Sequence, residues 1–390
     1  MVSYPDPETF GQYAALAAQT DKLNGADALA LAMQGILGEA GSVLAAVKKH
    51  RRDRLSFQVH RRVVLEELGD TLWYLASVAR HAGVSFIEVA ARLPASRLPN
   101  PVAGDDIPFS AIYDLDVVGD FEEDEPYMEE LAKFGSEVGF LLSLPLDPLD
   151  PYQIRDQLAS AMSELLTVAH LSGFTAREVA RWNLEKTFSR WPTSEYRVFE
   201  TTFDATAPDY ERLPQELSID IRLVESDGGK YFVYQSINGV HVGDRLTDNI
   251  SDQDYYRYHD VFHYAHAAVL HWSPVVRALL KVKRKHDDSI DRDQDGARAA
   301  IIEEAVTAYV FSRAKLQGYF DGVAVGALSY DLLKVIQDLT RGYEVENCPL
   351  WLWEEAILQG YAAFRALRTL GSGRIKISRT DRTINVEAIT

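Results

Sequence analysis

The stretch Glu66-Glu67-Leu68-Gly69-Asp70-Thr71-Leu72-Trp73-Tyr74 decides the fold of the first half of this chain. It lies in a run whose apolar residues recur at steps of three and four, the spacing that gives a helix one apolar face. That face is made by Val63, Val64, Leu68, Leu72, Leu75, Val78 and Ala79. On this helix Asp70 neighbours both Glu66 and Glu67 across one turn. Because neighbouring carboxylates repel each other unless a cation neutralises them, the stretch indicates a site for a divalent metal.

An upstream helix supplies a partner for these acids. It carries Glu39 within the segment Gly38–Ser42, and a basic run that begins at Lys48 and Lys49 follows. Acidic pairs at helical spacing also form ordinary solvated faces. The pattern by itself therefore leaves two interpretations open, a metal site and a solvated acidic face.

The order of these motifs resembles that of the MazG-like, all-α nucleoside triphosphate pyrophosphohydrolases. In that family a Glu-x-x-Glu helix is followed further along the chain by Glu-Leu-x-Asp. The matching segments here are Gly38–Ser42, the basic run from Lys48, and Glu67-Leu68-Gly69-Asp70 with Trp73-Tyr74. The family's second glutamate is Ser42 in this chain, so one of the carboxylates expected beside the metal is absent.

The resemblance implies a reaction that needs Mg²⁺ or Mn²⁺ and converts a nucleoside triphosphate to a monophosphate and pyrophosphate. Carboxylates would hold the metal, whose charge offsets that of the phosphates. The implied metal ligands are Glu39, Glu67 and Asp70. Glu66 would be a further ligand or would orient the attacking water.

The remaining family positions imply substrate contacts. Lys48 and Lys49 would bind the outgoing pyrophosphate as point charges. Trp73 or Tyr74 would stack on the base of the nucleotide. Aromatic residues at helical spacing are also ordinary core residues, so a structural role for these two side chains stays open.

The composition fits a protein of two or three folded domains. The chain has 390 residues, of which 47% are hydrophobic and 25% charged, an ordinary balance for a globular protein. Its net charge of −18 argues against a general nucleic-acid or membrane surface, because anionic partners attract clustered lysine and arginine. The single cysteine, Cys348, fits a reducing cytoplasm. The N-terminus has no secretory pattern, and no apolar run approaches the roughly 20 residues of a membrane helix.

Residues 1–93 are predicted to form a four-helix unit that carries the acidic site. Its helices are expected at Glu8–Lys22, Ala26–His50, Val59–Ala82 and Ser85–Leu93. Residues 94–126 contain several prolines and end in an acidic run. We predict that this segment is a linker that crosses the surface.

Residues 127–200 are predicted to be a degenerate second copy of this unit. Sliding Glu67–Ala90 by ninety positions gives Gln157–Ala180 without a gap. The pairs that stay in register are Leu68 with Leu158, Leu75 with Leu165, Val78 with Val168, Ala79 with Ala169 and Gly83 with Gly173. The acids are not kept at the aligned positions, where Gln157 replaces Glu67 and Ser160 replaces Asp70.

The family commonly closes its unit with an Asn-x-x-Lys motif near the metal and the phosphates. The first copy lacks this motif because Leu93-Pro94 ends the helix there. The second copy has it as Asn183 and Lys186, with Arg190 one turn later. The resemblance therefore implies one composite site, to which the second copy gives these three phosphate-binding residues. The alternative is that they end a helix and face water.

Residues 201–390 are predicted to form an α+β domain with a small antiparallel sheet beside a helical layer. Alternating segments indicate strands at Ser218–Glu225, Lys230–Ser236, Ile237–Val242, Arg374–Ser378 and Thr383–Glu387. Helices are expected between them, at Asp252–Leu270, Ser273–Lys285, Ala297–Gln317, Ser329–Arg341 and Leu350–Thr369.

A second candidate site lies in the first of these helices. His259, His263 and His266 share one helical face, and two histidines four residues apart can bind one transition metal. The other candidates are Asp260, Glu303 and Glu304 as further ligands, and Arg298 for a phosphate. Histidines on a half-buried helix often only hydrogen-bond to neighbours, so a structural role stays open. Tyr255–Arg313 also resembles the C-terminal module that accompanies some MazG-like pyrophosphohydrolases.

These observations predict a mainly α protein in which a duplicated MazG-like four-helix unit precedes an α+β domain. We expect a cytoplasmic, metal-dependent hydrolase of a small nucleotide, with neither nucleic acid nor membrane as a partner. Two alternatives stay open: a nucleotide-binding sensor that controls the C-terminal domain, and a helical scaffold attached to a hydrolytic His/Glu cluster. Family units generally work as dimers or tetramers. The fused pair would replace one such interface, and a homodimer stays open.

Overall fold

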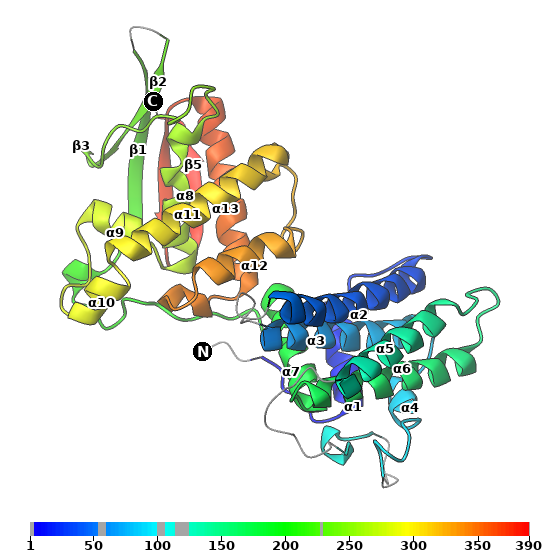
Figure 1. Cartoon of the computed structure of the whole chain (residues 1–390). Coiled ribbons are helices and arrows are strands. Elements are labelled where there is room, and N and C mark those ends of the chain that lie inside the picture. Colours follow the sequence, from blue (N-terminus) through cyan, green and yellow to red (C-terminus); the bar gives the residue numbers. More distant parts are fainter. Residues whose placement is uncertain (1–3, 54–59, 100–105, 114–124, 227–228, 390) are drawn as a thin grey trace. The chain divides into compact units, whose positions relative to one another are not determined.

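The structure is a computed structural model that describes residues 4–53, 60–99, 106–113, 125–226 and 229–389. The chain divides into two compact units between Arg197 and Val198. We call the first the helical unit and the second the mixed unit, since all the described strands lie in the second (Figure 1). The predicted fold class, mainly α with an α+β C-terminal part, is confirmed.

The helical unit is built around one hydrophobic core that runs from Phe10 to Phe188. Its helices are α1 (Phe10–Thr20), α2 (Ala28–Asp53), α3 (His60–His81), α4 (Phe86–Ala90), the 3₁₀ turn η2 (Phe109–Ala111), α5 (Glu125–Leu142), α6 (Pro151–Leu171) and α7 (Ala176–Arg190). The long helices α2 and α3 pack side by side, as do α5 and α6 (Figure 1). All four helices predicted in residues 1–93 are therefore present, with ends shifted by a few residues.

Helix α2 spans almost the predicted range. By length and composition alone it passes as a helix able to cross a membrane, whereas the sequence analysis found no apolar run of that length. In this fold one of its faces is buried against α3 and α5, and it carries Glu39, which lies near two carboxylates of α3. These contacts are those of a core helix in a bundle.

The two halves of the helical unit follow the register expected of a duplication. Shifting α3 by ninety positions covers residues 150–171, and α6 spans Pro151–Leu171. The same shift places the first residue of α4 on Ala176, the first residue of α7. Gly83 and Gly173, which follow α3 and α6, both adopt left-handed φ angles of +70° and +78°, a conformation that glycine reaches without strain. Helix α7 continues well beyond the length of α4.

The segment 94–126, predicted to be a surface linker, contributes to the core over its described part. Ile107, Phe109 and Ile112 are buried in the hydrophobic cluster of the unit. The backbone N–H of Phe10 donates to the carbonyl of Ile107 at 3.0 Å, and that of Phe109 donates to Glu8 at 2.9 Å. The prolines do mark irregular backbone, but the apolar residues between them anchor it. All but the last residue of the acidic run 120–125 lies outside the described residues.

The mixed unit contains a five-stranded antiparallel sheet in the order β3-β2-β1-β4-β5. Its strands are β1 (Glu216–Glu225), β2 (Tyr231–Ile237), β3 (Val240–His241), β4 (Gly373–Ser378) and β5 (Thr383–Glu387). Both predicted hairpins are confirmed. They join through β1 and β4, where Ile219 pairs with Ile375 at the centre of the buried face.

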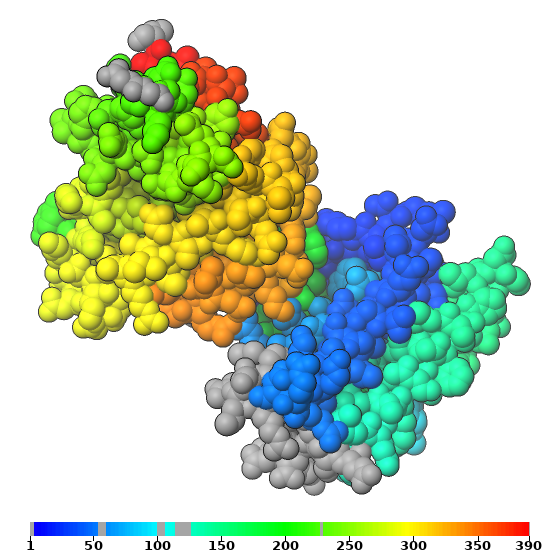
Figure 2. All heavy atoms as spheres, turned by 45° about the horizontal axis from the view of Figure 1, so that its top comes forward, coloured from blue at the N-terminus to red at the C-terminus, as the bar shows by residue number. Residues whose placement is uncertain are grey.

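Helices pack beside this sheet, and α8, α11 and α13 lie close together (Figure 1). The elements are η3 (Asp209–Glu211), η4 (Tyr256–Tyr258), α8 (Asp260–Ala265), a π-helical turn η5 (His266–Leu270), α9 (Pro274–Leu280), α10 (Asp288–Asp293), α11 (Ala297–Leu316), η6 (Gly318–Phe320), α12 (Tyr330–Leu339), η7 (Glu344–Asn347) and α13 (Leu350–Leu370). Helices α11 and α12, yellow to orange, form part of this unit's surface (Figure 2).

The predicted helix Asp252–Leu270 starts later than expected and is not one regular α-helix. Tyr255 adopts a left-handed φ angle of +71°, which an α-helix cannot continue through. After it come a 3₁₀ turn, the short α8 and the π turn, and His271, with a φ angle of +59°, ends the helical segment at Leu270 as predicted. This irregular segment carries the histidine cluster.

Candidate functional site

Three carboxylates converge in the helical unit. Glu39 from α2 and Glu67 and Asp70 from α3 each offer an oxygen, and these oxygens lie within 4.8 Å of one another. The convergence follows from the side-by-side packing of α2 and α3 (Figure 1). The structure thus brings together the three metal ligands that the family resemblance implies.

A glycine allows the last helix of the unit to approach this group. A Cβ atom on Gly69 would lie 3.0 Å from the Cβ of Asn183 and 3.3 Å from the carbonyl oxygen of Val179. Contacts this short are rarely tolerated without movement of the backbone. Gly69, one residue before Asp70, therefore permits the close packing of α7 on α3.

The close packing places the Asn-x-x-Lys motif against the carboxylates. The side-chain amide of Asn183 donates to Asp70 Oδ1 at 3.1 Å. The ammonium group of Lys186 forms an ion pair with Asp70 and a second one with Glu66 at 3.0 Å. Because Asn183 is fully buried, its amide holds the Asp70 carboxylate in a fixed orientation. The second half of the helical unit thus supplies two side chains to the carboxylates of the first half.

The carboxylates lack enough positive charge to be fully ionised together. Burial, followed by the hydrogen bond and the charge of Glu39, raises the pKa of Glu67 to about 8. Burial and the charge of Asp70 raise the pKa of Glu39. Burial also raises the pKa of Asp70, although Lys186 and Asn183 act in the opposite direction. A divalent cation with oxygen ligands would relieve this repulsion, so the donor set fits Mg²⁺ or Mn²⁺.

Glu66 has a different environment from the other three acids. Its side chain is 7% exposed, and it faces Lys186. It lies outside the group of converging oxygens. This placement favours a role in holding Lys186, while the expected role of Glu66 as a further ligand or water-orienting group stays a prediction.

The two aromatic residues next to the site pack against the bundle. Tyr74 lies against Gly35 of α2, where a Cβ atom would be 2.2 Å from the Tyr74 ring. Burial, and then the charges of Glu39 and Asp70, raise the pKa of Tyr74, which places its phenol within electrostatic reach of the carboxylates. The indole N–H of Trp73 donates to Thr20 Oγ1 at 3.0 Å. Base stacking by either ring stays a prediction.

The other predicted phosphate ligands are not part of the converging group. Lys48 and Lys49 are exposed and lie about 14 Å beyond Glu39 along the axis of α2, at a rise of roughly 1.5 Å per residue. Arg190 is buried at the end of α7, with its guanidinium group 5.3 Å from the centre of the Trp191 ring. A phosphate contact by these three side chains stays a prediction.

Tyr13 contributes to the site but was not predicted from the sequence. The hydroxyl of Tyr13, on α1, donates to Asn183 Oδ1 at 3.0 Å, and the residue is fully buried. Because Tyr13 occupies the amide oxygen of Asn183, the NH₂ group of that amide points at Asp70. In the sequence Tyr13 is one aromatic residue on an apolar helical face, and no spacing marks it as polar support for another helix.

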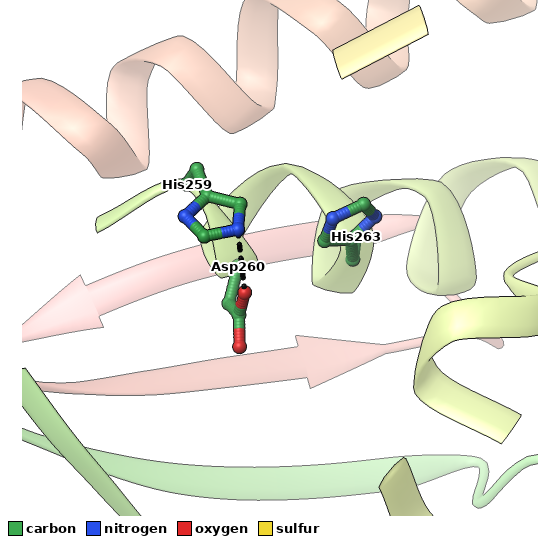
Figure 3. A group of neighbouring side chains, drawn as sticks. All are labelled: His259, Asp260 and His263. Atoms are coloured by element: carbon green, nitrogen blue, oxygen red, sulfur yellow. Dashed lines mark ion pairs between the residues drawn. The ribbon is translucent and has the colours of Figure 1, made fainter. Parts of the chain in front are cut away.

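The histidines of the mixed unit also cluster. One group joins His259, Asp260 and His263 (Figure 3), and a second joins His263 with His266 and Glu303. Glu304 lies 3.4 Å from His263 Nε2. Arg298 is exposed near the start of α11 and belongs to neither group, so its proposed contact with a phosphate stays a prediction.

Comparison with known proteins gives one match. A model of the family described as the MazG C-terminal domain matches residues 198–390, which are the residues of the mixed unit. No curated protein and no solved structure was found to match the chain.

Proposed function

Since residues 198–390 belong to the MazG C-terminal domain family, we propose that the chain is a nucleotide pyrophosphohydrolase whose reaction takes place in the helical unit. The observation that carries the proposal is the convergence of Glu39, Glu67 and Asp70. The contacts of Lys186 and Asn183 with Asp70 support it further, because a phosphate site needs positive charge and hydrogen-bond donors beside its metal ligands. The substrate is a nucleoside triphosphate, and the products are a nucleoside monophosphate and pyrophosphate.

Each residue of the group has a distinct task in this proposal. Glu39, Glu67 and Asp70 hold Mg²⁺ or Mn²⁺, which supplies charge that offsets the triphosphate. Asn183 keeps the Asp70 carboxylate in its orientation. Lys186 lies at the edge of the group with its ammonium shared between Asp70 and Glu66, so it can pair with a phosphate oxygen without moving far. Glu66 holds Lys186 at that edge.

The charge balance explains why this group needs its cation. With the pKa of Glu67 raised to about 8, the metal-free group holds a proton at neutral pH. Metal binding requires the ionised carboxylates and therefore displaces that proton. Ser42 stands where the family has a second glutamate, so the described ligand set is smaller by one carboxylate.

The proposal is tested by incubating the purified chain with nucleoside triphosphates and Mg²⁺ and separating the products. The wild type is expected to release monophosphate and pyrophosphate, and Glu39→Gln is expected to lower the rate by at least about 100-fold. Glu129→Gln, which changes an exposed acid on α5, serves as the matched control. Diphosphate and phosphate as products, or an unchanged rate in Glu39→Gln, would overturn the proposal.

Two alternatives have specific support. The absent carboxylate at Ser42 favours a nucleotide-binding sensor, which would bind nucleotide without turnover. The clustering of His259, Asp260 and His263 favours a hydrolase in the mixed unit with the helical unit as scaffold. A sensor would bind nucleotide without forming products. A hydrolase in the mixed unit would lose its rate when the histidines are replaced and keep it when Asp70 is replaced.

We further propose that the protein acts in the cytoplasm as a homodimer, without nucleic acid or membrane. Cytoplasmic location is supported by the single, buried Cys348. The dimer is supported by large apolar side chains exposed on neighbouring helices, which are Leu31, Leu37 and Leu44 on α2 and Phe140 on α5. Large apolar side chains that stay exposed are typical of subunit interfaces.

A further inference from the structure

The short helix α8 begins with an acid and a base in contact. Nε2 of His259 lies 3.2 Å from Oδ1 of Asp260, and His263 lies one turn further along (Figure 3). All three residues offer ligand atoms within 4.8 Å of one another. The other oxygen of Asp260 accepts a hydrogen bond from the Gln235 side chain of β2. The sheet therefore fixes the carboxylate in place beside the histidines.

The environment of His259 determines which nitrogen can bind a metal. Its Nδ1 lies 2.9 Å from the carbonyl oxygen of Tyr256, and its ring stacks on the Tyr256 ring at 4.4 Å with parallel planes. Because a carbonyl oxygen only accepts hydrogen bonds, Nδ1 carries the proton. In the neutral ring Nε2 then presents a lone pair to Asp260. A cation between the two, either a proton or a metal ion, makes this contact favourable.

His263 is buried between two carboxylates. It is 1% exposed, and its Nδ1 and Nε2 form ion pairs with Glu303 at 2.9 Å and with Glu304 at 3.4 Å. Carboxylates beside both nitrogens of a buried imidazole favour a cation at the ring, either a proton or a metal ion. The ring is thus placed as a metal ligand would be.

Glu303 is the residue that holds the His263 ring. Its carboxylate accepts hydrogen bonds from Ser273 at 2.8 Å and from the backbone N–H of Val275 at 2.9 Å, and it lies 3.0 Å from Nδ1 of His266. It is completely buried. A carboxylate fixed behind a histidine is the usual support for a metal-binding imidazole.

We propose that His259, Asp260 and His263 bind a divalent transition metal ion in the mixed unit, with Glu304 at its solvent side. Two imidazoles and carboxylates are ligands that Zn²⁺ and related ions accept, whereas Mg²⁺ prefers oxygen ligands alone. The side chain of Glu304 is 45% exposed, which leaves that edge open to water or an anionic ligand. Glu303 is a positioning residue. The site is separate from the carboxylates of the helical unit.

The test uses the full chain in a Glu39→Gln background, so that the helical unit is not the source of bound metal. After treatment with a chelator, the protein is titrated with Zn²⁺, and with Co²⁺ as a spectroscopic probe. One bound ion per chain is expected, with Co²⁺ absorption bands typical of nitrogen and oxygen ligands. His259→Gln and Asp260→Asn should each weaken binding by at least about 10-fold.

A matched control is His241→Gln, because His241 is an exposed histidine on β3 of the same unit and should leave binding unchanged. Circular dichroism of each variant shows whether it is folded, and Zn²⁺ should raise the melting temperature of the parent more than that of folded His259→Gln. Absence of Zn²⁺ and Co²⁺ binding in the parent would overturn the proposal. So would equal affinity in the folded variants, which would leave His259 and Asp260 as a simple ion pair.

Discussion

The ammonium group of Lys186 is paired with the carboxylate of Asp70, which lies 116 positions earlier in the chain. The pair joins the last helix of the helical unit to the helix that carries two of the three converging carboxylates. It shows that the second half of the helical unit supplies positive charge to the carboxylates of the first half.

Replacing Lys186 should therefore slow the proposed hydrolysis, although this residue lies far from Asp70 in the sequence. Lys186→Ala is expected to lower kcat/KM for a nucleoside triphosphate by about 10- to 100-fold, because Asp70 and Glu66 lose their common cation. Steady-state kinetics measure this effect. Lys133→Ala, which removes a lysine 58% exposed in its side chain on α5, is the control. Equal rates for the two variants would show that the contact has no part in turnover.

Gly69 offers a steric test of the same packing. Gly69→Ala places a Cβ 3.0 Å from Asn183, so α7 must move away from α3. We expect a loss of about 1–3 kcal/mol in the free energy of unfolding, together with reduced turnover. Gly139→Ala is the control, since a Cβ there meets nothing within 4 Å and should stabilise α5 slightly. Urea unfolding compares the two, and an unaffected Gly69→Ala protein would contradict the packing argument.

His271 predicts how the stability of the mixed unit depends on pH. Burial, and then the charge of Arg382, lowers its pKa to about 4, while the unfolded chain takes up the proton near pH 6.5. The unfolded state thus binds more protons between these values, and stability falls as the pH drops from about 6.5 to about 4.

His271→Asn isolates this contribution, because asparagine tolerates the left-handed backbone of the position. The loss of unfolding free energy between pH 7 and pH 4.5 should shrink by about 1–3 kcal/mol relative to the parent. Urea titrations at the two pH values give the difference. A loss of the same size in both proteins would mean that His271 does not titrate as described.

The exposed leucines of α2 allow a test of the proposed homodimer. Leu37 is 50% exposed near the middle of the helix, so Leu37→Glu should introduce a charge into the proposed dimer interface and shift the protein to monomers. Light scattering after size-exclusion chromatography measures the mass. Tyr152→Glu, at an exposed position of α6, is the comparison. A monomeric wild type, or a dimer that survives Leu37→Glu, would exclude this interface.

Much of this fold follows from periodicity. The three- and four-residue spacing around Leu68 and Leu72 predicts α3, and alternation predicts β1, β2, β4 and β5. The late start of the predicted helix Asp252–Leu270 could not be predicted, because Tyr255 adopts a left-handed φ angle that is uncommon for residues other than glycine. The packing of Ile107 into the core was hidden by the surrounding prolines.

The candidate sites were also predictable from the sequence only in part. Resemblance to a family pointed to Glu39, Glu67 and Asp70, and the structure brings them together. The contact of Asn183 with Tyr13 depends on how α1, α3 and α7 meet, which no local pattern encodes. In the mixed unit, the helical spacing of His259 and His263 was visible in the sequence. The support of His263 by Glu303 needed the three-dimensional packing of α8 on α11.

The most direct test of the central claim compares product formation by the wild type, Asp70→Asn and His263→Ala, with nucleoside triphosphate and Mg²⁺. Asp70→Asn keeps the shape of the side chain but removes one of the three proposed metal ligands and the charge that pairs with Lys186. The account predicts that the wild type releases monophosphate and pyrophosphate and that Asp70→Asn loses at least about 100-fold in rate. A rate that survives in Asp70→Asn and disappears in His263→Ala would contradict it and place the chemistry in the mixed unit.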